Sequence, residues 1–211
     1  VTGGSRGIGA AIARRLAADG AAVAITYSSG KLKADEVVRS IESAGGRAVA
    51  IQADNADAAA VRSAVAETVK SLGRLDVLVN NAGIAAIAPI EQFSLEDFDR
   101  TVAINVRAVF VAAQEAARHI DGGGRIINIG SVNADRMPFA GGSVYAMSKA
   151  AVAGLTRGLA RDLGPRGITV NTVQPGPVET DMNPATGPFA ESLKNLMALP
   201  RYGQADEIAG M

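Results

Sequence analysis

The sequence predicts an α/β protein built on a doubly wound parallel sheet with helices on both faces. Segments rich in Val and Ile alternate along the chain with amphipathic helical segments, which is the pattern of βαβ units. Each apolar run is nearly continuous and is bounded by Gly, Asp or Asn, as in strands that are buried on both faces. The chain has 211 residues, of which 48% are hydrophobic, so we expect a single domain over residues 1–211.

The alternation places strands and helices in turn along the chain. Strands are predicted at residues 22–27, 48–53, 75–80, 125–129 and 169–174. Helices are predicted at residues 8–19, 33–44, 57–72, 95–120 and 144–163. Val1 is expected to be the last residue of a first strand, most of which is missing, and residues 206–211 are interpreted as a helix that is cut shortly after its start.

Composition excludes several classes of function. The 21 Lys and Arg residues are balanced by 21 Asp and Glu, so no broad basic field favours nucleic acid or anionic lipid as a partner. No apolar run approaches the roughly 18 residues of a membrane span. The absence of cysteine excludes thiol nucleophiles and fits a cytoplasmic location, and a single histidine argues against a metal site.

The predicted helix at 95–120 is apolar around most of its circumference between residues 103 and 113. Such a helix needs cover on two sides, and the sheet provides only one of them. We expect a second copy of the chain to cover the other side, with the helix carrying Leu155, Leu159 and Leu163 as its neighbour. The alternative is a helix that is buried within one chain.

A glycine-rich turn lies between Val1 and the first predicted helix, in the segment Thr2-Gly3-Gly4-Ser5-Arg6-Gly7-Ile8-Gly9. Glycines at 3, 7 and 9 allow a tight turn, close approach of a pyrophosphate and close packing of helix on strand. The helix N-terminus offers free N–H groups to the anion. In its βαβ context the turn predicts a dinucleotide site, although a glycine turn alone could be purely structural.

The second predicted strand ends in Tyr27-Ser28-Ser29-Gly30-Lys31, and no Asp or Glu occurs between Asp19 and Asp35. A carboxylate in this region would hold the ribose 2′-hydroxyl of NAD. Without one, a 2′-phosphate can lie among Arg6, Ser28, Ser29 and Lys31. We therefore expect NADP(H) in preference to NAD(H), the alternative being that Arg6 and Lys31 are ordinary solvated charges.

Tyr145 and Lys149 are four residues apart and share one face of a predicted helix. An adjacent ammonium group favours the phenolate, so Lys149 is expected to lower the pKa of Tyr145. Ser131 directly follows the strand at 125–129, at the sheet edge where open α/β folds bind ligands. Ser143, two residues before Tyr145, is an alternative to Ser131.

These motifs, in this order, resemble the short-chain dehydrogenase/reductase family over essentially the whole chain, and the resemblance implies a three-layer Rossmann fold. It rests on the turn at 2–9, Asn80-Asn81-Ala82-Gly83, Asn105, Ser131, the Tyr145/Lys149 pair, and Pro175-Gly176 followed by Thr180. The resemblance implies that Tyr145 exchanges a proton with a substrate oxygen as hydride moves to or from a nicotinamide. Ser131 would hold that oxygen, Lys149 the nicotinamide ribose, and Asn105 a water that connects Lys149 to solvent.

The resemblance also implies which residues contact the cofactor. These are Gly3, Ser5, Arg6, Gly7, Ile8, Gly9, Tyr27, Ser28, Ser29, Asp54, Asn55, Asn81, Ala82, Gly83, Tyr145, Lys149, Pro175, Gly176, Val178 and Thr180. Family members continue into a last strand and a C-terminal segment that this sequence lacks.

The sequence says less about the substrate and the partner than about the fold and the cofactor. Residues 184–202 are interpreted as a moderately apolar lid suited to a hydrophobic carbonyl compound or alcohol, the alternative being a plain surface helix. The sequence resembles 3-oxoacyl-acyl-carrier-protein reductases, although the turn at 119–125 has fewer basic residues than an acidic carrier would favour. The segments at 130–138, 174–177 and 183–185 also resemble proteins described as cyclic-di-GMP-binding biofilm dispersal mediators. In that alternative the cleft holds a regulatory dinucleotide.

Overall fold

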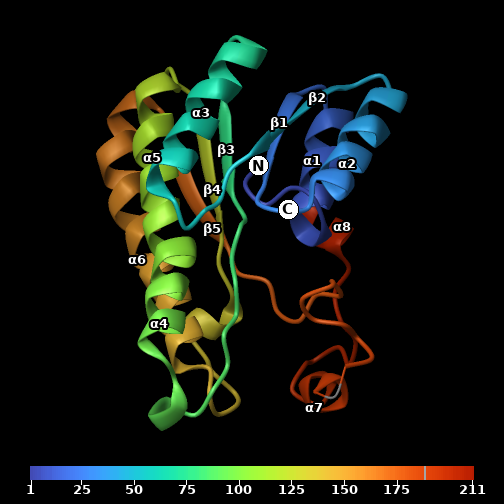
Figure 1. Cartoon of the computed structure of the whole chain (residues 1–211), viewed down its shortest axis with the longest axis vertical. Coiled ribbons are helices and arrows are strands. Elements are labelled where there is room, and N and C mark those ends of the chain that lie inside the picture. Colours follow the sequence, from blue (N-terminus) through green and yellow to red (C-terminus); the bar gives the residue numbers. More distant parts are fainter. Residues whose placement is uncertain (188) are drawn as a thin grey trace.

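A computed structural model describes residues 1–187 and 189–211, so residue 188 of the predicted lid lies outside the description. Parallel strands lie between two layers of helices, which confirms the predicted fold class (Figure 1). The strands are β1 (Ala22–Tyr27), β2 (Arg47–Gln52), β3 (Val77–Asn80), β4 (Arg125–Ile129) and β5 (Thr169–Val173). β1 pairs with β2, and β4 pairs with both β3 and β5.

Val1 and Thr2 lie between the two groups of strands. The amide of Thr26 donates to the carbonyl of Val1 over 3.0 Å, and the amide of Thr2 donates to the carbonyl of Val79 over 2.9 Å. The segment is not itself assigned to a strand. It connects the edge of β1 to the edge of β3, which is where the sequence predicts the end of a first strand.

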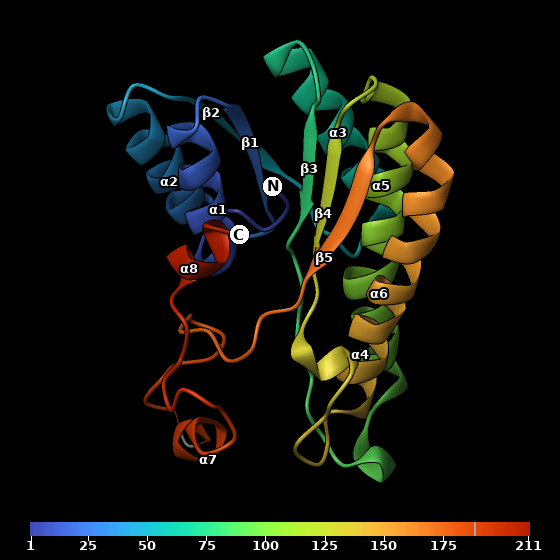
Figure 2. The same cartoon turned by 180° about the vertical axis from the view of Figure 1, so that it is seen from behind.

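Helices cover both faces of the strands, as Figure 2 shows from behind. One layer holds α1 (Gly7–Ala18), α2 (Lys31–Ser43) and α8 (Ala205–Ala209), and the other holds α3 (Ala58–Leu72), α5 (Ala108–His119) and α6 (Ser143–Leu163). Short helices occur at α7 (Ala190–Lys194), Ile90–Gln92, Val132–Ala134 and Gly164–Arg166. In the described part of the chain, no helix is both long and apolar enough to cross a bilayer.

The predicted helix at 95–120 is not uniform. It begins as α4 (Leu95–Val102), widens into a π-helical turn at Ala103–Arg107 and continues as α5. The amide of Ala108 bonds to the carbonyl of Ala103, one residue farther back than in an α-helix. Asn105 lies in this wide turn with only 2% of its surface exposed, so the irregularity directs a polar side chain into the interior.

A buried polar chain fastens α6 to the strands. Asn80 Nδ2 on β3 donates to Asn128 Oδ1 on β4 over 2.8 Å, and Asn128 Nδ2 donates to Thr156 Oγ1 on α6, also over 2.8 Å. Thr172 Oγ1 on β5 donates to the same Thr156 oxygen over 2.7 Å. These linked hydrogen bonds lie beneath the carboxyl ends of the strands, so they fix the position of α6 at that edge.

Asn128→Ala is expected to lower the free energy of unfolding by about 2–4 kcal/mol, because it leaves the donor of Asn80 and the acceptor of Thr156 without their partner in the interior. Urea denaturation measures the change. Asn171→Ala on the exposed face of β5 is the matched control and is expected to change stability by less than about 0.5 kcal/mol. If Asn128→Ala lowered the free energy of unfolding by less than about 1 kcal/mol, these hydrogen bonds would not be a stabilising network.

Candidate active site

A cavity of about 340 Å³ opens at the carboxyl ends of the strands and extends from the glycine turn to α6. All the residues predicted to carry catalysis or to contact the cofactor line it, apart from Ser29 and Asn105. Ser29 is exposed, whereas Asn105 is buried. Ser143, the alternative to Ser131, is exposed at the start of α6 and is not among the lining residues. The predicted motifs therefore converge on one cavity.

The glycine turn has the backbone geometry that a bound phosphate group needs. Gly3 and Gly7 adopt φ values of 63° and 53°, where side chains are disfavoured. A Cβ at Gly9 would lie 2.5 Å from the carbonyl oxygen of Gly3. Arg6 precedes α1 and provides no side-chain cap, so the first N–H groups of this 12-residue helix remain available to an anion.

The far end of the cavity is lined by Arg6, Tyr27 and Ser28, with Asp54 and its neighbour Asn55 after β2. Asp54 Oδ1 accepts a hydrogen bond from the amide of Ala56 over 2.9 Å, which orders this turn.

The structure places Lys31 outside the cavity lining, because its Nζ lies 2.7 Å from Asp35 Oδ2 on the same helix. Lys33 is not among the lining residues either, but it pairs with Asp181, an acidic residue of the lining that the sequence did not identify. Nothing in the local pattern distinguishes Lys33 from Lys31, since its partner is 148 residues away.

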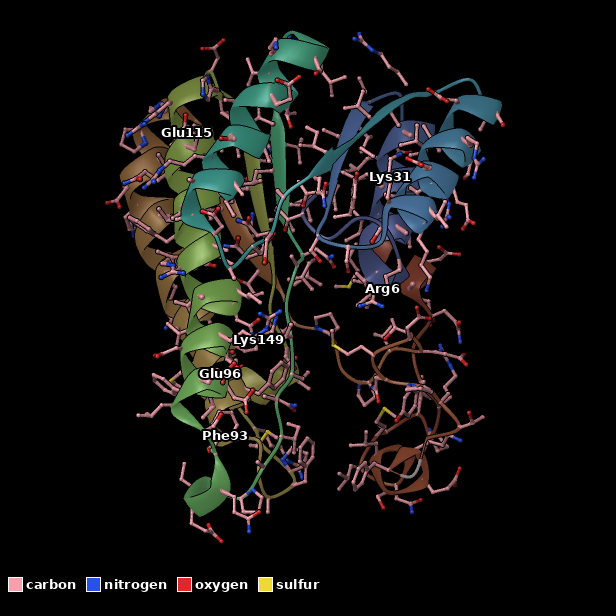
Figure 3. The ribbon with its side chains drawn as sticks, viewed as in Figure 1. Arg6, Lys31, Phe93, Glu96, Glu115 and Lys149 are labelled. Carbon is pink, nitrogen blue, oxygen red and sulfur yellow. The ribbon has the colours of Figure 1, made fainter. Side chains whose placement is uncertain are left out.

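Ser131, Tyr145 and Lys149 meet at the other end of the cavity. Lys149 is 7% exposed, and its Nζ donates to the carbonyl of Ile129 over 2.9 Å. The same Nζ lies 5.8 Å from the centre of the Tyr145 ring. In Figure 3, Lys149 comes from the half of the molecule that holds α6, and Arg6 comes from the opposite half.

The pKa values of the pair depart from the sequence-based expectation. Burial raises the pKa of Tyr145 above its ordinary value, and a hydrogen bond with Ser131 opposes part of that rise. Burial lowers the pKa of Lys149 to about 8. The expectation that Lys149 lowers the pKa of Tyr145 is therefore wrong for this structure, in which desolvation dominates both groups and the Lys149 ammonium is bonded to Ile129.

Asn105 is joined to the active site through Ser148, a residue that the sequence analysis missed. Asn105 Nδ2 donates to Ser148 Oγ over 3.0 Å and to the carbonyl of Ile84 over 2.9 Å, and its Oδ1 accepts from the amide of Ile84 over 2.9 Å. Ser148 Oγ donates to the carbonyl of Tyr145 over 2.7 Å. The Asn105 side chain thus joins the loop after β3 to the helical turn between Tyr145 and Lys149. A water held by Asn105 stays a prediction.

A flap, at residues 181–202, runs from the cavity to α7 and on toward α8 (Figure 1). None of the described residues of the predicted lid at 184–202 is among the lining residues, so the structure does not bear out a lid over the cavity. Its two ends are held together by hydrogen bonds from the amide of Glu179 to the carbonyl of Gly203 and from the amide of Gly203 to the carbonyl of Pro177, each 2.9 Å long. Asp181, Met182 and Asn183 of the flap line the cavity, as does Arg100 of α4. Apolar side chains on the flap are exposed, with Phe189 at 74% and Leu199 at 67%.

In the part of the chain that the structure describes, no group of three or more His, Cys, Asp or Glu side chains could hold a metal ion.

The sequence and the structure both have close counterparts among known proteins. A family model described as "short chain dehydrogenase" matches residues 1–190. The cyclic-di-GMP-binding biofilm dispersal mediator protein of Escherichia coli is 51% identical over 211 residues, which are 100% of this chain and 85% of that protein. The 3-oxoacyl-[acyl-carrier-protein] reductase of a Synechocystis strain is 41% identical over 212 residues, with 100% and 85% covered.

A solved structure of a short-chain dehydrogenase from Burkholderia cenocepacia in complex with NADP superposes with a TM-score of 0.98 at 58% identity. The match covers 100% of this chain and 86% of the other. The family match, the identities and the shared architecture agree with the motifs assembled in the cavity. The chain belongs to the short-chain dehydrogenase family.

Proposed function

We propose that this protein is an NADP(H)-dependent carbonyl reductase, and in reverse an alcohol dehydrogenase, that acts on a ketone such as a 3-oxoacyl thioester. The observation that carries the proposal is the meeting of Ser131, Tyr145 and Lys149 in the same cavity as the glycine turn. The membership of the family and the NADP complex of the Burkholderia relative support it.

The residues of the cavity fit this cofactor. At Gly3, Gly7 and Gly9 a Cβ would press on the chain's own atoms, so only glycine permits this tight turn, whose backbone a pyrophosphate can approach closely. Arg6, Ser28 and Ser29 would hold the 2′-phosphate, and Asp54 with Asn55 the adenine. Residues of the nicotinamide end would be Asn81, Ala82, Gly83, Tyr145, Lys149, Pro175, Gly176, Val178 and Thr180. When bound, NADPH supplies a hydride for the carbonyl carbon.

The chain's own groups handle the proton. Tyr145 holds its proton at neutral pH, because burial raises its pKa, and its Oη is the donor for a carbonyl oxygen in reduction. Ser131, which hydrogen-bonds to Tyr145, orients that oxygen. Lys149 presents a desolvated ammonium beside the ring, and Asn105 fixes the surrounding backbone through Ser148 and Ile84.

The test is consumption of NADPH and NADH by the purified protein with a panel of ketones that includes an acetoacetyl thioester. We expect oxidation of NADPH with at least one ketone, and faster oxidation of NADPH than of NADH. Absence of turnover with every ketone, in a protein that binds NADPH by fluorescence, would reject the enzyme assignment.

A second candidate function is the binding of cyclic-di-GMP as a regulatory ligand. The 51% identity to the Escherichia coli biofilm dispersal mediator supports it. Titration with cyclic-di-GMP in the absence and presence of NADPH tests this function. Tight binding that NADPH displaces, without ketone turnover, would favour the sensor over the enzyme.

We further propose that two copies of the chain pack through α5 and α6, as a dimer or within a tetramer. Most apolar residues between 103 and 113 are buried within the one chain, as the alternative to an oligomer expects. Phe110 on α5, however, is 44% exposed and Met147 on α6 is 41% exposed. Sedimentation is expected to give a mass that is a multiple of the protomer's, and Phe110→Lys is expected to lower it. A monomeric mass for the unaltered protein would contradict the proposal.

A further inference from the structure

Asp181, the first residue of the flap, lies between two cations beside the glycine turn. Its Oδ2 is 2.7 Å from Lys33 Nζ and 3.8 Å from Arg6 Nη1. The three side chains come from segments far apart in the sequence, namely the flap, the first turn of α2 and the glycine turn. Figure 3 shows Arg6 at the end of α1 that faces the flap, and Lys31 farther from the flap.

The carboxylate is charged but weakly held. The hydrogen bond from Lys33, together with the nearby charge of Arg6, lowers the pKa of Asp181. All three side chains are more than half exposed, at 56%, 53% and 60% for Asp181, Lys33 and Arg6. Ion pairs this exposed contribute little free energy, so another anion can readily replace the carboxylate. A group with higher charge and more acceptor oxygens can therefore replace the carboxylate.

The neighbouring backbone brings this cluster up to the cofactor turn. A Cβ at Gly7 would lie 3.2 Å from Thr180 Cγ2, so the residue before Asp181 rests on the glycine turn. A Cβ at Gly30 would lie 3.6 Å from Ser5 Oγ, so the start of α2 also meets that turn. Arg6 is one of the residues proposed to hold the 2′-phosphate, and Lys33 is brought beside Arg6 by the carboxylate that the two share.

We propose that Lys33 and Arg6 together form the 2′-phosphate site, and that Asp181 fills this site until a phosphate displaces it. The inference rests on the proposed cofactor of this protein. A phosphate monoester carries about −1.5 to −2 charges near neutral pH and three acceptor oxygens, against one charge on Asp181. It is therefore the stronger partner for two cations. Asp181 weakens the binding of NADPH by competition and has no such effect on NADH.

Lys31 provides a matched comparison, because it lies two residues from Lys33 on the same helix and also pairs with an aspartate over 2.7 Å. Its partner, Asp35, is on α2 and does not line the cavity, whereas Asp181 does. Neutralising Asp35 changes the net charge of the protein by the same amount as neutralising Asp181. Comparing the Asp181 variant with the Asp35 variant therefore separates a local effect at the cavity from the effect of a changed net charge.

The experiment is calorimetric titration of the full chain with NADPH, NADH, adenosine 2′,5′-bisphosphate and 5′-AMP. Asp181→Asn is expected to lower the Kd of NADPH and of the bisphosphate by about 3–10-fold. Lys33→Met is expected to raise both by about 5–10-fold. NADH and 5′-AMP are expected to bind equally to all variants, and Asp35→Asn and Lys31→Met are expected to behave as the unaltered protein.

Unchanged or weaker binding of the bisphosphate by Asp181→Asn would overturn the inference, because a competitor's removal must strengthen binding. Failure of the unaltered protein to bind the bisphosphate more tightly than 5′-AMP would overturn it as well. Strengthened bisphosphate binding by Asp181→Asn, in a protein that turns over no ketone, would support the inference and reject the proposed reductase. The two conclusions are thus tested by different readouts.

Discussion

Tyr145→Phe is expected to reduce kcat/KM for NADPH-dependent ketone reduction by about 10²–10⁴-fold, the usual contribution of a general acid. The substitution removes only the phenolic oxygen, which is the proton donor that the proposed reaction requires. The Tyr145 backbone and its contact with Ser148 are unaffected. The Kd of NADPH and the urea midpoint are expected to stay close to those of the unaltered protein, so loss of rate would report on chemistry.

Tyr202→Phe is the matched control for this measurement. Tyr202 is 4% exposed, and its hydroxyl lies 3.4 Å from Asn183 Oδ1, but Tyr202 is not among the residues that line the cavity. Its removal is expected to change kcat by less than about threefold, since it holds no proton for the substrate. If Tyr145→Phe kept a tenth or more of the activity, the proton would have to come from another group.

Lys149→Met is expected to make the protein inactive and, at neutral pH, more stable. The activity loss is about 10²–10³-fold in kcat, because the desolvated ammonium beside Tyr145 is removed. The gain in stability arises because burial lowers the pKa of Lys149 from 10.5 to about 8, which corresponds to a cost on the order of 3 kcal/mol. Loss of the hydrogen bond to Ile129 offsets about 1 kcal/mol of this gain.

The stability difference has a defined pH dependence. Below pH 8 the lysine is protonated in both the folded and the unfolded chain, so the full cost of burying the charge is present. Between pH 8 and 10.5 the folded chain releases the proton first, the unfolded chain binds more protons, and the stability of the unaltered protein rises with pH. The advantage of Lys149→Met is therefore largest below pH 8 and disappears toward pH 10.5.

Urea unfolding of both proteins at several pH values between 7 and about 10 measures this effect. Lys70→Met, at a side chain that is 80% exposed, is the control and is expected to show no such trend. A Lys149→Met variant that is less stable at pH 7 would show that the contacts of the ammonium outweigh its desolvation.

The sequence predicts the strands and the positions of Ser131, Tyr145 and Lys149, because each of these features depends on a short stretch of residues. Buried parallel strands give continuous apolar runs, and a spacing of four residues fixes two side chains on one helix face. The glycine turn is similarly local. The structure agrees with the sequence analysis at these places.

Other features depend on contacts between distant residues. The π-helical turn around Asn105 occurs together with its bonds to Ile84, 21 residues away, and the periodicity of apolar residues does not indicate it. The pairing of Lys33 with Asp181 crosses 148 residues. The pKa of Lys149 reflects burial by several elements together, so the sequence could identify the residue but not the direction in which its environment acts.

The flap leaves and rejoins the fold at one point. Because Glu179 and Pro177 both bond to Gly203, the backbone positions on either side of the flap are set independently of what lies between them. Residues 184–202, whose described members do not line the cavity, can accordingly vary in length and composition without disturbing the strands, Tyr145 or Lys149. Insertions and deletions are expected to be tolerated in a segment anchored in this way, because the strands do not depend on its interior.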